Sequence, residues 1–108
     1  MTSPPPPPGF EWDPKKRDLN LEKHGVDFFD ATTVFEDRFA RPLSDGIDAE
    51  TGEVRLRLMG HTKDHLLIVV AFVEREDDPG AEVIRIISAR EALPHERKAY
   101  EENPWGPQ

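Results

Sequence analysis

The sequence has no cysteine among its 108 residues, so it offers no disulfide framework, no thiolate nucleophile and no thiolate metal ligand. No apolar run approaches the roughly 20 residues that a membrane-spanning helix needs. The first nine residues have neither the charged start nor the apolar middle of a secretion signal. We therefore expect a soluble, cytoplasmic protein that folds as one domain.

The sequence also lacks an excess of basic residues. Its formal net charge of -8 argues against a surface that attracts nucleic acid everywhere. Residues 54–90, however, contain six Lys or Arg and six Asp or Glu, and four of those acids fall within residues 74–78. A locally basic face is therefore compatible with an acidic chain.

Three neighbouring segments hold most of the apolar residues: 53–60, 65–74 and 82–89. The first alternates strictly between apolar and polar residues, which predicts a strand with one buried side. The second is apolar on both sides and β-branched, which favours a central strand covered above and below. Because the links at 61–64 and 75–81 are short, we expect antiparallel neighbours joined by hairpins.

Capping signals predict two helices before these strands. Asp13 is a good N-cap, Pro14 suits the first helical position, and Gly25 follows as the stop after His24. Leu19 and Leu21 are the expected apolar contacts of this helix. Asp27 then caps a second helix whose apolar stripe runs from Phe28 to Phe35.

A third helix starts at Pro94 and ends before Asn103-Pro104. Phe39 to Ser44 forms a short edge strand, and 45–52 is a loop. The expected fold class is thus α+β, with two N-terminal helices, an antiparallel sheet of three to four strands and a C-terminal helix. Residues 1–9 form a disordered Pro-rich arm, 10–102 the single domain and 103–108 a loose tail.

Several motifs occur together along the domain: Phe10-Glu-Trp-Asp-Pro14, Asn20-Leu-Glu-Lys-His-Gly-Val26, Val34-Phe-Glu-Asp37, and Ile84-Arg-Ile-Ile-Ser-Ala-Arg90 followed by Glu96 and Tyr100. In this order and at these separations they resemble the BrnT family of toxins. The resemblance covers residues 10–102, and no single motif would be specific alone.

The resemblance implies a RelE-like fold, a small antiparallel sheet with helices packed on it. It also implies the toxin of a type II toxin–antitoxin pair, a ribonuclease held inactive by a BrnA-like antitoxin. That antitoxin would bind operator DNA, so DNA is reached only through it, and a 2:2 complex is expected.

RNA cleavage without a metal needs a base for the 2′-hydroxyl proton, an acid for the leaving 5′-oxygen and positive charge at the phosphate. The strand face that carries Arg57 and His61 meets part of this need, joined by Arg75 and by Arg90 after the last strand. Arginine clamps phosphate in a bidentate manner, and histidine titrates near neutrality. We expect Arg57, His61, Arg75 and Arg90 to be the catalytic residues. The four histidines lack paired ligand spacing, so we expect no metal and no cofactor.

Two alternatives stay open. Arginines that alternate on a strand also occur on simple solvated faces, and Arg90 either serves the site or pairs with Glu91 or Glu96 to hold the third helix. The whole chain is either an active nuclease or a catalytically weak binding module that only pairs with a DNA-binding antitoxin. The acidic charge favours the binding module somewhat, because an acidic chain suits a basic, DNA-binding partner.

Overall fold

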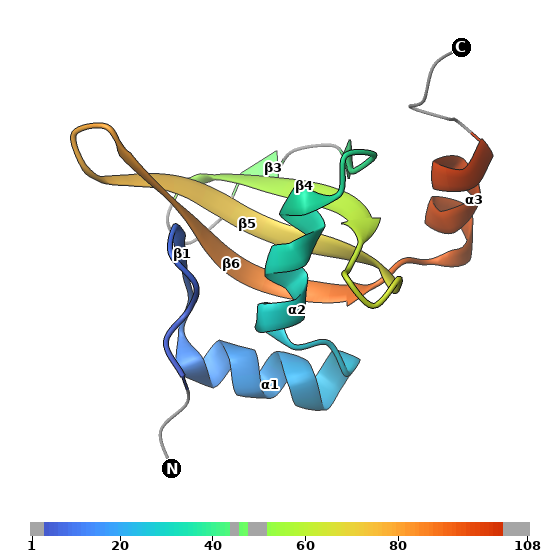
Figure 1. Cartoon of the computed structure of the whole chain (residues 1–108), viewed down its shortest axis with the longest axis horizontal. Coiled ribbons are helices and arrows are strands. Elements are labelled where there is room, and N and C mark those ends of the chain that lie inside the picture. The colour runs from blue at the N-terminus through green and yellow to red at the C-terminus, as the bar shows by residue number, and fades with distance from the viewer. Residues whose placement is uncertain (1–3, 44–45, 48–51, 103–108) are drawn as a thin grey trace.

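The computed structural model describes residues 4–43, 46–47 and 52–102 and shows a six-stranded sheet with helices beside it (Figure 1). The elements follow in the order β1 (Phe10–Glu11), α1 (Pro14–His24), α2 (Phe28–Thr32), the 3-10 helix η1 (Thr33–Glu36), β2 (Arg41–Pro42), β3 (Gly46–Ile47), β4 (Val54–His61), β5 (Leu67–Asp78), β6 (Ala81–Glu91) and α3 (Pro94–Glu102). The predicted α+β class, with two helices before the main strands and one after them, is confirmed. No helix in the described residues has the length and apolar character to span a membrane.

The sheet is larger than predicted, and it is mixed. The strand order is β1-β6-β5-β4-β2, with β3 also paired to β4. All pairs are antiparallel except β1 with β6, where Phe10 lies opposite Ile84. The strands β1 and β3 each have two residues and were missed, because two residues show no periodicity and their pairing depends on distant partners. The loop assigned to 45–52 was therefore wrong at Gly46–Ile47.

The hairpin between β5 and β6 is also longer than predicted. The expected link at 75–81 is mostly strand, and only Pro79 and Gly80 form the turn. Gly80 has a φ of 85°, which glycine adopts without steric cost. The hairpin extends beyond the rest of the sheet, at the end opposite α3 (Figure 1). Residues 74–78 there are all charged and four of them are acidic, so the segment has the composition of a loop and the pairing of a ribbon.

The second helix changes type midway. It was predicted as one helix through Phe35, but α2 ends at Thr32 and continues as η1. The hydroxyls of Thr32 and Thr33 donate to the carbonyl oxygens of Phe29 and Asp30, three residues back, at 2.7 and 2.6 Å. These local bonds favour the tighter turn. Both N-caps are confirmed, since Asp13 and Asp27 accept from the N–H groups of Lys15 and Phe29.

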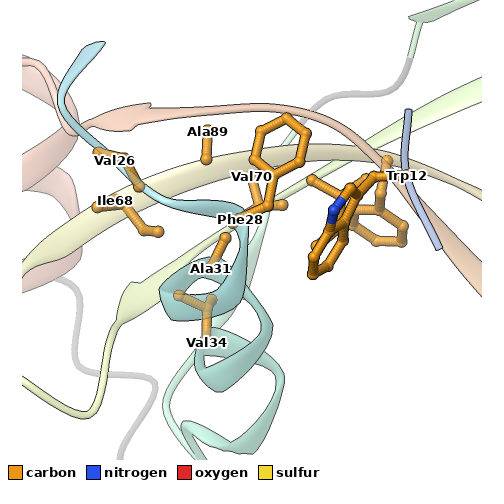
Figure 2. Close-up of a cluster of buried hydrophobic side chains, with 10 residues drawn as sticks. Trp12, Val26, Phe28, Ala31, Val34, Ile68, Val70 and Ala89 are labelled. Carbon is orange, nitrogen blue, oxygen red and sulfur yellow. The ribbon is translucent and has the colours of Figure 1, made fainter. Parts of the chain in front are cut away.

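The main core lies between α2, η1 and one face of the sheet (Figure 2). Phe28 and Val34 are fully buried against Ile68 and Val70 of the central strand, and Trp12 packs edge-on against Phe28. Met59, Leu67 and Val69 are buried on the opposite face in a second, smaller cluster. The prediction that the 65–74 segment is covered on both faces is therefore confirmed.

Helix α1 is anchored at the edge of β6 through a polar residue. Leu19 and Leu21, the predicted apolar contacts, are 63% and 42% exposed. Asn20 is buried instead, and its amide nitrogen donates to the carbonyl oxygens of Val26 and Ala89 at 2.9 and 2.8 Å. Its amide oxygen accepts from the N–H of Ala89 at 3.1 Å. The side chain thus pairs with β6 as another strand would.

Candidate active site

The second face of the sheet, at the end nearest α3, carries three of the four predicted site residues. Arg57, Met59 and His61 alternate along β4 and so share a face. The register places Met59 opposite Val69 of β5, and Val69 opposite Arg90 of β6. Arg90 therefore lies on the same face as Arg57 and His61. It is two strands away from Met59, which lies between those two residues on β4.

Helix α3 lies against this face and is held mainly by polar contacts. The Arg90 guanidinium donates to both carboxylate oxygens of Glu96, at 2.7 and 3.0 Å. The Arg41 guanidinium donates to the carbonyl oxygen of Ala99 at 3.0 Å. Tyr100 reaches His61, and Glu96 is the one buried residue of helix 94–102. The alternative reading of Arg90, a partner of Glu96 that holds the third helix, matches this arrangement.

A groove runs beside the helix between α3 and the strands β2 and β4. The residues that line it are Arg41, Pro42, Leu43, Arg57, Met59, His95, Glu96 and Ala99. Among the described residues, two guanidinium groups, one imidazole and a single carboxylate therefore border the same hollow. Such a groove suits an anionic, elongated ligand.

The carboxylate of the groove is already committed to an ion pair. The hydrogen bonds from Arg90 lower the pKa of Glu96 to about 2, and the N–H of Leu93 also donates to it. The same pair raises the pKa of Arg90. Glu96 therefore stays ionised at neutral pH and is a poor general acid or base. It neutralises Arg90, and Arg41 and Arg57 are the other two arginines of this region, both of which line the groove.

His61 lies at the end of β4, beside a second, shallower hollow lined by Thr33, Glu36, Asp37, His61, Thr62 and Lys63. Its Nδ1 is 3.3 Å from the hydroxyl of Tyr100, and the two rings meet edge-on. The Tyr100 hydroxyl donates to Asp37 at 3.0 Å. The His61 side chain is 37% exposed, so its ring can reach a ligand.

Arg75 lies apart from the other three. Its guanidinium and that of Arg85 both donate to Glu11, at 2.7 and 2.8 Å. Arg75 is eight residues along β5 from Leu67, the register partner of His61, which is about 26 Å at 3.3 Å per residue. The structure therefore brings Arg57, His61 and Arg90 around α3 and leaves Arg75 at the far end of the sheet. Its catalytic role stays a prediction.

Sequence reasoning missed several residues of this region, namely Arg41, His95, Asp37 and the contacts of Tyr100. Arg41 sits in a two-residue strand, and His95 in the first turn of a helix whose docking no local pattern reveals. The signal that was present is the family motif, which contains Asp37, Glu96 and Tyr100. In the described part of the chain, no cluster of three or more His, Asp or Glu is arranged to hold a metal ion.

The fold and these motifs define a class of protein that comparison with known families identifies. A family model described as the ribonuclease toxin BrnT of type II toxin–antitoxin systems matches residues 12–96. The protein is a type II toxin of the ribonuclease class, and the chain belongs to the BrnT family. The resemblance found in the sequence is confirmed.

A solved structure agrees with this assignment. The chain is similar to the Brucella abortus ribonuclease toxin BrnT, known from a 1.1 Å crystal structure, with 30% sequence identity and a TM-score of 0.54. The match covers 76% of this chain and 92% of that one. No curated protein sequence gives a match.

Proposed function

We propose that this toxin cleaves RNA without a metal ion, in the groove between α3 and strands β2 and β4, and that it acts in the cytoplasm. The observation that carries the proposal is the juxtaposition of Arg41, Arg57 and His95 along one groove, with His61 further along the face of β4 that carries Arg57. The guanidinium groups bind the phosphates of a strand laid along the groove. The exposed imidazole of His61 supplies the acid–base group.

The reaction is an internal transfer at phosphorus. The 2′-oxygen attacks the adjacent phosphorus while His61 accepts the 2′-hydroxyl proton, and the bond from phosphorus to the 5′-oxygen breaks. The products are a 2′,3′-cyclic phosphate and a 5′-hydroxyl. The leaving 5′-oxygen takes up a proton, for which His95, the second imidazole of this region, is the candidate. Arg57 stabilises the negative charge that develops on the phosphate.

The proposed partner is a BrnA-like antitoxin, which neutralises the toxin and connects it to operator DNA, in a 2:2 complex. Support comes from charge. The chain carries a formal net charge of -8, and a protein that binds DNA presents basic surface. Association between the two is then favoured electrostatically and weakens as salt rises.

Induced expression of the chain without an antitoxin tests the proposal. Wild type should arrest growth and degrade cellular RNA. Arg57→Ala should relieve both effects, because loss of one fixed positive charge at the phosphate costs about 10²–10³ in rate. Arg97→Ala is the matched control, since Arg97 is not among the residues that line the groove and its ion pair within the described residues is a 3.9 Å surface contact with Glu101. Unimpaired growth at confirmed soluble expression of the wild type contradicts the nuclease.

A second candidate function is a binding module without residual catalysis. It is favoured by α3, which lies over the candidate face and neutralises Arg90 through Glu96. The growth experiment separates the two functions. A chain that binds its antitoxin tightly yet leaves growth and RNA unaffected is the binding module.

A further inference from the structure

A chain of hydrogen bonds joins three separate parts of the fold beside the groove. Asp37 follows η1, His61 ends β4 and Tyr100 lies in α3. One carboxylate oxygen of Asp37 accepts from the backbone N–H of His61 at 2.8 Å and from the Tyr100 hydroxyl at 3.0 Å. The other accepts from the N–H of Phe39 at 2.9 Å. The Asp37 side chain is 12% exposed, so these donors replace most of its water.

The hydrogen bonds determine the protonation states of Asp37 and Tyr100 at neutral pH. Burial opposes the charge on Asp37, but the N–H groups of His61 and Phe39 and the hydroxyl of Tyr100 outweigh it and lower the pKa of Asp37. Burial and the neighbouring Asp37 raise the pKa of Tyr100 to about 12. At neutral pH, Asp37 is therefore an acceptor only, and Tyr100 keeps its proton.

These states determine which ring nitrogen of His61 carries hydrogen. The Tyr100 hydroxyl has one proton and donates it to Asp37, so its oxygen is left to accept. The group 3.3 Å from that oxygen is Nδ1 of His61. Nδ1 is thus the protonated nitrogen, and in the neutral ring Nε2 holds the lone pair.

Close backbone approach supports the same arrangement. Gly60 precedes His61, and a Cβ at this position would lie 3.0 Å from a carboxylate oxygen of Asp37, 3.0 Å from Val34 and 3.1 Å from Ala40. A residue without a side chain is what lets Asp37 reach the His61 backbone. The other charged groups bordering this hollow are Glu36 and Lys63, neither of which bonds Nδ1 in the described residues.

We propose that Tyr100 and Asp37 are positioning residues, which hold His61 as the Nδ1–H tautomer so that Nε2 accepts the 2′-hydroxyl proton. This rests on the proposed RNA cleavage, with His61 as its base. A carboxylate that orients a histidine through the nitrogen not used in catalysis serves this purpose in hydrolases. Here a tyrosine hydroxyl stands between the two. Because that tyrosine belongs to α3, the base is correctly set only while α3 is seated.

The tautomer of His61 can be measured in the wild-type protein without an activity assay. Long-range ¹H–¹⁵N spectra of the ¹⁵N-labelled full chain distinguish a protonated Nδ1 from a protonated Nε2. We expect the neutral His61 ring as Nδ1–H, and a neutral ring with the hydrogen on Nε2 overturns the proposal. Exposed His24 and His65 serve as internal references in the same spectrum.

Tyr100→Phe then tests the consequence for catalysis, since it removes one oxygen and keeps the ring against His61. We expect kcat for cleavage of a labelled single-stranded RNA to fall about 10- to 100-fold with KM little changed, and the His61 spectrum to lose its single tautomer. Arg97→Gln, also in α3, is the control and should match wild type. An unchanged kcat in a folded Tyr100→Phe overturns the positioning role while leaving the nuclease intact. A wild type that shows the Nδ1–H ring but cleaves nothing refutes the proposed function instead.

Discussion

Asn20, a buried polar residue, attaches α1 to the sheet in place of the apolar contacts that were predicted for this helix. Because β1 pairs only Phe10 and Glu11 with β6, the rest of that edge offers unpaired backbone groups. Asn20 satisfies both backbone groups of Ala89, the N–H and the C=O, and at the same time the carbonyl of Val26, where the chain turns into α2. Its amide therefore anchors α1 and sets the path between the first two helices.

Asn20→Ala should lower the free energy of unfolding by about 3 kcal/mol, because it leaves a buried N–H and two carbonyl groups without partners. Urea denaturation of both proteins measures this difference. Leu19→Ala is the matched control: the side chain is 63% exposed, so a change within about 0.5 kcal/mol is expected. Equal losses in the two variants would show that Asn20 is not the anchor.

The candidate site residues also differ in how well their positions could be predicted from the sequence. Alternation along 53–60 correctly predicted that Arg57 and His61 share a face, since that property depends only on the strand. Arg75 was placed with them because the central strand was predicted to end at residue 74, directly before it. The ribbon it belongs to carries it away from the groove and into contact with Glu11.

At the scale of elements, α3 is the part of the fold on which the proposed positioning of His61 depends. The contacts that hold it include Arg90 with Glu96, Arg41 with Ala99 and the Tyr100 hydroxyl with Asp37. Polar contacts of this kind depend on ionisation, whereas apolar packing does not. Seating of α3 should therefore respond to pH.

Glu96→Gln tests this at acidic pH. The carboxyl has a pKa of about 2 in the folded chain against an ordinary 4.5, so the ion pair stabilises the fold above about pH 4.5 and is lost as pH falls towards 2. That shift corresponds to at most about 3 kcal/mol by linkage. Between pH 5 and pH 2, the free energy of unfolding of wild type should fall by about 2 kcal/mol more than that of Glu96→Gln. Parallel pH profiles in urea denaturation would refute a stabilising role for the pair.

Elements marked by local chemistry were predicted well from the sequence. The N-caps Asp13 and Asp27 and the stop at Gly25 place α1 and the start of α2 correctly. Elements that depend on tertiary contacts were not, namely β1, β3 and the docking of α3. The change from α2 to η1 lies between these cases, because Thr32 and Thr33 are visible in the sequence but their back-bonding is decided by packing.

Over the whole molecule, the acidic hairpin and the candidate active site lie at opposite ends of the sheet. The hairpin of β5 and β6 extends at one end, while α3 lies at the other (Figure 1). Exposed Glu74 and Glu76 belong to the hairpin, and Arg41 and Arg57 border the groove. In a chain with a formal net charge of -8, two arginines thus lie where an RNA phosphate is proposed to bind, whereas Arg75 lies towards the hairpin.

Metal-free cleavage of RNA at the α3 groove is tested most directly by incubating the purified, full-length protein with a labelled single-stranded RNA in EDTA. The prediction is fragments ending in 2′,3′-cyclic phosphate, formed about 100-fold more slowly by Arg57→Ala and at the wild-type rate by Arg97→Ala. Intact RNA after incubation with folded wild type, or equal rates for Arg57→Ala and wild type, would contradict it.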